Sequence, residues 1–272
     1  MSLDPVLLRS LLAIEPYLDQ VVVAGGWVPY LYQQLADQGS SQRPPRTQDI
    51  DLAVPRDLVL KEHSVDELLK AVGFKCKFCS LDTPPVTKYV AGDDDEVEIE
   101  FITDAPGSKE GVRPVQPGLT AQELRYVGLL LENTRLVRLL PPNERLTVRV
   151  PTPGAFILHK ALVVRRRREP VKKEKDLFYI FFVVVSFPEW REAMAEELAG
   201  LAQGRPRWFR RALKDLTAWF ESPDAEGISA LLNQRPATAY PALTDNQFCQ
   251  YAYDAVAELV DMMQAIADRD RI

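Results

Sequence analysis

The chain has 272 residues, 46% of them hydrophobic and 26% charged, which is ordinary for a globular protein. Its formal net charge of −6 disfavours nucleic-acid binding over the whole surface, so any such contact would need a local basic patch. Three cysteines fit a reducing compartment, and the longest apolar run, 177–187, is too short to span a bilayer. We therefore expect a soluble, cytoplasmic protein that has no membrane partner and forms one large domain or two modest ones.

The first apolar segments predict a helix and then a strand that stops at a glycine pair. Residues 5–14 have helical periodicity, and residues 21–24 read as a buried strand that leads into Gly25 and Gly26. A helix is expected over 27–36. Glycine lets the backbone approach a ligand closely, and the start of a helix carries unpaired N–H groups. This arrangement suits phosphate.

A second strand, predicted within residues 46–54, carries two carboxylates. Asp49 and Asp51 are two residues apart and share one face, whereas Ile50 and Leu52 point to the other face. Neighbouring carboxylates repel each other unless a cation lies between them. Oxygen ligands favour Mg²⁺, which also binds substrate phosphates. The alternative is an aspartate that only caps a loop.

Further strands follow. A capping box at Ser64 opens a helix that reaches residue 71, and strands are expected over 75–80 and 87–91. Residues 96–102 alternate cleanly, which places Glu98 and Glu100 together on one face. Taken alone, this pattern also suits a solvated strand face. The segment 105–120 is rich in glycine and proline and predicts a loop, and residues 136–150 predict two short strands.

From Pro151 onward the chain turns helical, which marks a domain boundary. Helices are predicted over 155–168, 172–187, 189–202, 206–220, 224–233 and 244–267. Four consecutive arginines, Arg165, Arg166, Arg167 and Arg168, form the only dense basic run. They either complement a helix C-terminus or guide a polyanionic partner.

A strand, a glycine pair, a helix and an Asp-x-Asp strand together resemble the nucleotidyltransferase superfamily with the polymerase-β-like fold. The resemblance implies an α+β fold with a mixed sheet and flanking helices. It implies a catalytic domain over 1–150 and a helical domain over 151–272 that completes the cleft. Asp49 and Asp51 would bind two Mg²⁺ ions, and Gly25 and Gly26 would hold the triphosphate of a nucleoside triphosphate (NTP). The third carboxylate of the family pattern would be Glu100, with Glu98 as the second choice; both are candidate metal ligands.

Residues around this motif look more like the branch that contains the AbiEii-type toxins. Arg46 and Thr47 precede the Asp-x-Asp strand, Lys160 lies on a helix, and Lys175 and Asp176 follow it. The resemblance implies that Lys160 touches the triphosphate and that Lys175 and Asp176 lie at the domain cleft, facing the nucleotide site. Arg46 and Thr47, just before the strand, are further candidate nucleotide contacts, and Arg46 would pair with a phosphate through two hydrogen bonds. Tyr179 stands where the branch often has a second Asp. Arg46 could instead pair with Asp51 or a loop carbonyl, and the tip of Lys160 could simply be solvated.

The resemblance implies a metal-dependent enzyme that moves a nucleoside monophosphate from an NTP to an acceptor hydroxyl. The acceptor would be RNA such as a tRNA end, guided by Arg165 to Arg168, and the partner of a toxin would be an antitoxin protein. One alternative is a small-molecule adenylyltransferase of the aminoglycoside-modifying kind. Another is a degenerate member that binds nucleotide without turnover.

Overall fold

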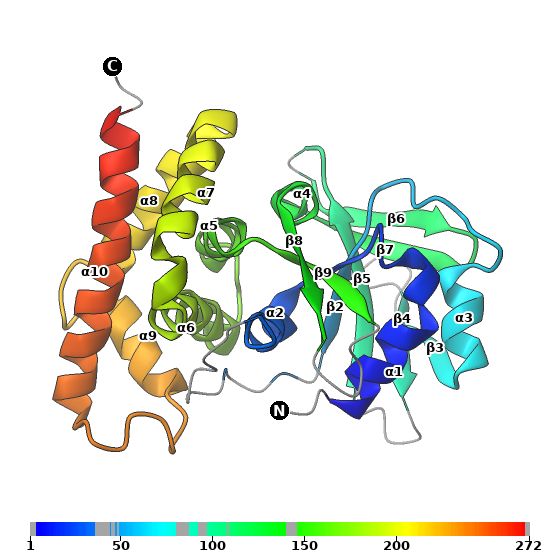
Figure 1. The fold of residues 1–272 in the computed structure, drawn as a ribbon, viewed down its shortest axis with the longest axis horizontal. Helices are drawn as coiled ribbons and strands as arrows, with labels where there is room; N and C mark the ends of the chain where they lie inside the picture. The colour runs from blue at the N-terminus through cyan, green and yellow to red at the C-terminus, as the bar shows by residue number, and fades with distance from the viewer. Residues whose placement is uncertain are drawn as a thin grey trace. The chain divides into compact units, whose positions relative to one another are not determined.

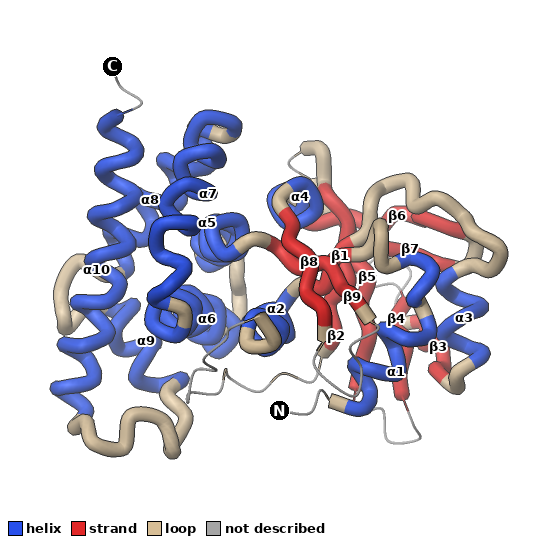
Figure 2. Tube along the Cα trace, in the orientation of Figure 1, coloured by secondary structure: helices blue, strands red, loops and turns tan. Residues whose placement is uncertain are grey.

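The computed structural model describes residues 4–35, 44, 47, 49–79, 87–91, 97–107, 109–139 and 146–269 (Figure 1). The chain divides into two compact units. The first, which we call the sheet unit, contains Met1–Leu35 and Arg46–Pro151, and the second, the helical unit, contains Ala36–Pro45 and Thr152–Ile272. All of the described strands belong to the sheet unit (Figure 2).

The described strands of the sheet unit form one mixed sheet. They are β1 (Val22–Val23), β2 (Ile50–Ala53), β3 (Phe74–Phe78), β4 (Thr87–Ala91), β5 (Val97–Asp104), β6 (Gly111–Gln116), β7 (Leu119–Leu124), β8 (Thr134–Arg138) and β9 (Thr147–Pro151). Their order is β3-β4-β5-β2-β1-β9-β8, and β7 pairs with β5 and carries β6. The pairs β2–β5, β5–β7 and β1–β9 are parallel, and the others are antiparallel. The predicted α+β class with a mixed sheet is confirmed.

Short helices accompany this sheet. They are α1 (Pro5–Ala13), η1 (Glu15–Tyr17), η2 (Gly25–Trp27), α2 (Val28–Tyr32), α3 (Val65–Ala71) and α4 (Val127–Glu132). The predicted capping box of α3 is present: Glu67 N donates to Ser64 Oγ at 3.2 Å, and Ser64 N donates to Glu67 Oε2 at 2.7 Å. Reciprocal caps of this kind satisfy backbone donors that the helix cannot satisfy itself.

The two faces of β2 and β5 have different neighbours. On one face, Ile50, Leu52 and Ile99 are fully buried. On the other face, Ala53 and Ile102 belong to an apolar cluster whose members include Val22, Ala24, Val127 and Leu130. Because side chains alternate along a strand, Asp51 lies on the same face as this cluster, two residues before Ala53.

Two sequence-based expectations for the sheet unit need correction, and one short helix was not predicted. The helix expected over 27–36 ends earlier, since α2 stops at Tyr32. The loop predicted over 105–120 is wrong, because β6 and the start of β7 lie there. Pro114 made this strand hard to predict. Proline is tolerated there because, among the described strands, β6 is an edge strand that pairs with β7 alone. The six-residue α4 was not predicted, because it is too short to show helical periodicity.

The helical unit contains the helices predicted for the C-terminal part of the chain. They are α5 (Pro153–Val164), α6 (Pro170–Ser186), η3 (Pro188–Trp190), α7 (Arg191–Gly204), α8 (Pro206–Trp219), α9 (Glu226–Gln234) and α10 (Asp245–Arg269). The buried helix α6 packs against α5, α9 and α10. Its Phe181 ring meets Phe248 edge-on at 5.7 Å between centroids. Among the described helices of the chain, none combines the length and the apolar character needed to cross a membrane.

Candidate functional site

The predicted glycine turn and the second aspartate of the Asp-x-Asp pair lie against each other. Strand β1 leads to Gly25, whose φ of +64° is a backbone conformation that residues other than glycine rarely adopt. A Cβ at Gly25 would lie 1.9 Å from Asp51 Oδ2, so only glycine leaves room for that carboxylate. A backbone hydrogen bond keeps Asp51 next to the glycine turn: Ala24 N donates to the carbonyl oxygen of Asp51 at 2.8 Å.

The parallel pairing of β2 and β5 brings a further carboxylate beside Asp51. Asp51 pairs in register with Glu100. Register neighbours on adjacent strands lie about 4.8 Å apart and project from the same face. Glu98 lies two residues earlier on that face. The structure therefore lines up Gly25, Asp51 and Glu100 across neighbouring segments of the sheet unit.

The residues just before β2 are less enclosed. Asp49 is exposed and precedes the first residue of β2. Thr47 is half-buried, and its hydroxyl donates to the carbonyl oxygen of Asp49 at 3.5 Å. Arg46, also predicted to contact the nucleotide, lies outside the described residues. Gly26, the next residue after Gly25, is buried.

A lysine that the sequence reasoning missed contacts the acidic side chains of β5. The Lys88 ammonium, on β4, lies 2.8 Å from Glu100 Oε1 and also donates a hydrogen bond to Glu98 Oε2. Burial alone would lower the pKa of Lys88, but the hydrogen bonds to Glu100 and Glu98 outweigh it and raise that pKa. The antiparallel pairing of Tyr89 with Ile99 places Lys88 beside Glu100. The sequence does predict strands in both of these segments, and pairing them as antiparallel neighbours could have predicted the contact of Lys88 with Glu100.

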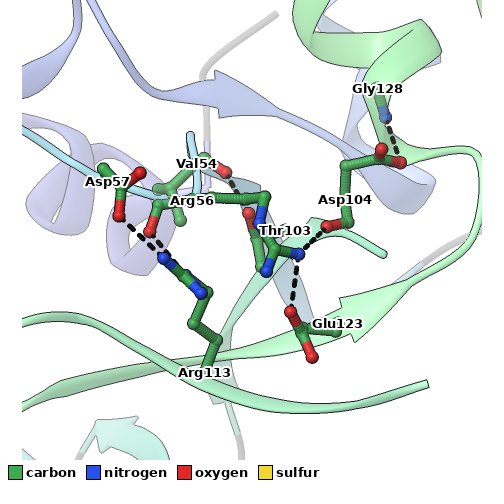
Figure 3. A network of polar contacts seen from close by, with 8 residues as sticks. All are labelled: Val54, Arg56, Asp57, Thr103, Asp104, Arg113, Glu123 and Gly128. Atoms are coloured by element: carbon green, nitrogen blue, oxygen red, sulfur yellow. Dashed lines mark hydrogen bonds and ion pairs between the residues drawn. The ribbon is translucent and has the colours of Figure 1, made fainter. Parts of the chain in front are cut away.

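A polar network fixes β2 and β5 at the end away from Asp51 (Figure 3). Arg56 Nη1 donates to the carbonyl oxygen of Asp104 at 2.7 Å and pairs with Glu123 Oε1 at 2.6 Å. The Thr103 hydroxyl donates to the carbonyl oxygen of Val54 at 2.8 Å. These contacts join the segment after β2 to β5 and β7.

The same network extends to β6 and α4 (Figure 3). Arg113 Nε donates to the carbonyl oxygen of Arg56 at 3.0 Å, and Arg113 Nη2 lies 2.8 Å from Asp57 Oδ1. Gly128 N donates to Asp104 Oδ1 at 2.8 Å. A slip of β2 against β5 by one residue would break the contacts of Arg56 with Asp104 and of Thr103 with Val54, so these two contacts support the register that sets Asp51 beside Glu100.

The carboxylate oxygens of Asp51 and Glu100 are of the chemical type that binds a magnesium ion. Carboxylate oxygens are the ligands that Mg²⁺ prefers, and the Asp51 carboxylate occupies the place that a side chain at residue 25 would take. Within the part of the chain that the structure describes, no three His, Cys, Asp or Glu side chains are gathered closely enough to hold a metal ion. Glu100 meets an ammonium group from Lys88 instead.

Two residues predicted to touch the nucleotide are paired with each other in the helical unit. Lys160 on α5 and Asp176 on α6 are both buried, and the Lys160 ammonium donates to Asp176 Oδ1. Arg167 Nε donates to Asp176 Oδ2 at 2.6 Å. Burial alone would raise the pKa of Asp176, but the positive charges of Lys160 and Arg167 outweigh it and lower that pKa.

Two further basic candidates, Lys175 and Arg165, also have neighbours inside this unit. The Lys175 ammonium lies 6.0 Å from the centroid of the Tyr179 ring. Arg165 Nε lies 2.8 Å from Oδ1 of Asp215, which is buried. Arg165 and Arg167 are therefore each paired with a buried aspartate.

A mixed sheet with accompanying helices, in which a glycine turn packs against the carboxylate of a neighbouring strand, is consistent with a nucleotidyltransferase fold. The sequence model of a family described as nucleotidyltransferase matches residues 6–199, which is well over half of the chain. The chain therefore belongs to this nucleotidyltransferase family. Searches of the curated proteins and of the solved structures found no match.

Proposed function

We propose that the protein transfers a nucleoside monophosphate from an NTP to an acceptor hydroxyl and releases pyrophosphate, with Asp49, Asp51 and Glu100 as its metal-binding carboxylates. The acceptor oxygen would form a bond to the α-phosphorus as the bond from that phosphorus to the β-phosphate oxygen breaks. The observation that carries this proposal is the packing of the Asp51 carboxylate against Gly25, with Glu100 in register beside it. Both features lie within the residues that the family model matches.

Each residue would have a separate task. The backbone at Gly25 and Gly26 would face the triphosphate, because no side chain there blocks a close approach. Asp49 and Asp51 would hold divalent ions, and Glu100 would share one of them. When bound, Mg²⁺ offsets the charge that develops on the phosphate oxygens. Glu100 would also accept the proton of the acceptor hydroxyl, which makes that oxygen a better nucleophile.

The acceptor in this proposal is RNA, such as a tRNA end, as in the AbiEii-type branch that the sequence resembles. Arg165 to Arg168 would supply the basic contact. Two observations favour a small-molecule acceptor as the second candidate: two of these arginines already pair with buried aspartates, and the chain carries a net charge of −6. Fewer available cations weaken the attraction to a polyanion.

The residues of the helical unit enter the proposal less directly. Lys160 would reach a triphosphate only by leaving Asp176, and separating a buried ion pair is costly. We therefore centre the reaction on the sheet unit. The contacts of Lys160, Lys175 and Asp176 with nucleotide, like those of Arg46 and Thr47, stay predictions.

The test is a transfer assay with each α-labelled NTP and Mg²⁺, in parallel with total RNA and with a panel of hydroxyl-bearing small molecules. Asp51→Asn and Glu100→Gln keep the shape of each side chain and remove its charge. We expect each to lower the transfer rate by about 100-fold or more, since the carboxylates would hold the catalytic ions. Asp254→Asn, an exposed change on α10, is the matched control and should keep the wild-type rate.

The acceptor arm decides between the candidates. Label that enters RNA supports the first acceptor, and label that enters a small molecule supports the second. Binding of NTP without transfer to any acceptor would contradict the proposal and indicate the degenerate alternative. Transfer that survives Asp51→Asn would place the chemistry elsewhere in the chain.

A further inference from the structure

The geometry points to Lys88 as a built-in counter-ion of the proposed active site. We propose that its ammonium partly neutralises Glu98 and Glu100 and so keeps the affinity of the free protein for divalent metal low. Metal would then bind mainly together with the NTP. This inference rests on the proposed function and concerns the regulation of that same site.

Contacts on β4 and β5 carry this inference. Lys88 meets both carboxylates of the alternating face, with its ammonium 2.8 Å from Glu100 Oε1 and hydrogen-bonded to Glu98 Oε2. The exposed fractions of the three side chains are 20% for Lys88, 30% for Glu98 and 18% for Glu100. Charges that are partly withdrawn from water interact more strongly than fully exposed ones, so this cluster is more than a surface ion pair.

Because Lys88 lies next to the proposed metal-binding carboxylates, its charge would weaken the binding of a metal ion. Glu100 is in register with Asp51, so an ion shared by these two residues would lie close to the Lys88 ammonium. Two cations that share one carboxylate repel each other. The ammonium is fixed by the fold, whereas the metal is free to leave. The metal is therefore the partner whose binding is weakened.

A triphosphate changes this balance. It brings up to four negative charges and oxygen ligands of its own to the metal. The added negative charge offsets the repulsion from Lys88, so the ion is held firmly only when nucleotide is present. Lys88 is accordingly a positioning residue that acts on the metal through Glu100, and no contact of its own with substrate is required.

The experiment measures Mn²⁺ affinity without nucleotide, by the loss of the free-ion electron paramagnetic resonance signal, on the full chain. Lys88→Met and Lys88→Gln both remove the charge, so either one suffices if the other fails to fold. Each should bind Mn²⁺ at least about tenfold more tightly than the wild type, because a full positive charge next to the ion is gone. Thermal melts provide a second readout, since a tighter ligand raises the midpoint more.

Two controls separate charge from packing. Lys88→Arg keeps the charge and should bind Mn²⁺ like the wild type. Lys109→Met removes the same charge from an exposed residue beyond the far end of β5 and should also match the wild type. Unchanged or weaker Mn²⁺ binding in Lys88→Met and Lys88→Gln would overturn the inference.

A double variant distinguishes failure of this inference from failure of the proposed function. Adding Asp51→Asn to Lys88→Met should abolish the gain in Mn²⁺ affinity. If Asp51→Asn lowers Mn²⁺ binding but the Lys88 variants bind like the wild type, only the role of Lys88 is refuted. If the tight Mn²⁺ binding of Lys88→Met survives Asp51→Asn, the ion is bound elsewhere, and both proposals fall.

Discussion

At the scale of single residues, Gly25 is the position where a small change should do most harm. Gly25→Ala would place a methyl group at the site of Asp51 Oδ2 and force a side chain onto a φ of +64°. The left-handed conformation alone costs about 1 kcal/mol, and the clash adds to it. We expect the variant to lose nucleotide transfer and to unfold at lower urea concentration, as followed by circular dichroism.

Gly200→Ala is the matched control for this prediction. Gly200 lies inside α7, and a Cβ there meets nothing within 4 Å. Alanine should stabilise this helix by about 0.5–1 kcal/mol and leave transfer intact. Wild-type activity in Gly25→Ala would mean that the Asp51 carboxylate does not need the space beside the glycine turn.

His159 should make the stability of the protein depend on pH. Its Nδ1 is buried and has no hydrogen-bond partner among the described residues. Burial, aided by the charge of Lys160, lowers the pKa of His159 from 6.5 to about 3. Between these values the unfolded chain binds more protons than the folded one, so stability falls as pH drops. We expect a loss of about 2 kcal/mol between pH 6.5 and 4.5 in urea titrations.

One variant separates this histidine from other titrating groups. His159→Gln stays neutral and should flatten that part of the pH profile. A slope that persists in His159→Gln would refute the assignment.

At the scale of elements, one buried ion pair joins α5 to α6. Asp176→Asn keeps the volume but removes the charge that both Lys160 and Arg167 face. An unpaired buried ammonium is expensive, so we expect a loss of about 3 kcal/mol in the free energy of unfolding, measured with urea. Glu258→Gln, in the exposed pair with Arg191, should cost less than about 1 kcal/mol. Equal effects of the two changes would show that burial of the α5–α6 pair does not matter.

Elements with strong local signals were predictable from the sequence. The helices of the C-terminal part, the capped helix α3 and strand β4 follow from periodicity, capping residues and alternation, which act over a few residues. Strand β6 was not predicted, because it contains a proline. A strand tolerates proline at the edge of a sheet, and the sequence does not show that β6 is an edge strand paired with β7. The end of α2 at Tyr32 was not predicted from the sequence either.

At the scale of the whole molecule, we expect the helical unit to fold by itself. Its α6 buries apolar side chains against α5, α9 and α10, and all four helices lie in one stretch of sequence. A fragment of residues 152–272 should show the circular dichroism of a helical protein and a single cooperative melting transition. A broad, non-cooperative melt would mean that this unit needs the rest of the chain for its core.

The sequence by itself determined the residue types of the candidate site and the local elements that carry them. The strand before Gly25 and the Asp-x-Asp segment depend on neighbours only a few positions apart. Only the tertiary structure decided that Asp51 lies in register with Glu100, that Lys88 meets Glu98 and Glu100, and that Lys160 is buried against Asp176. These are pairings between distant segments, which depend on how strands and helices pack and which no local pattern specifies.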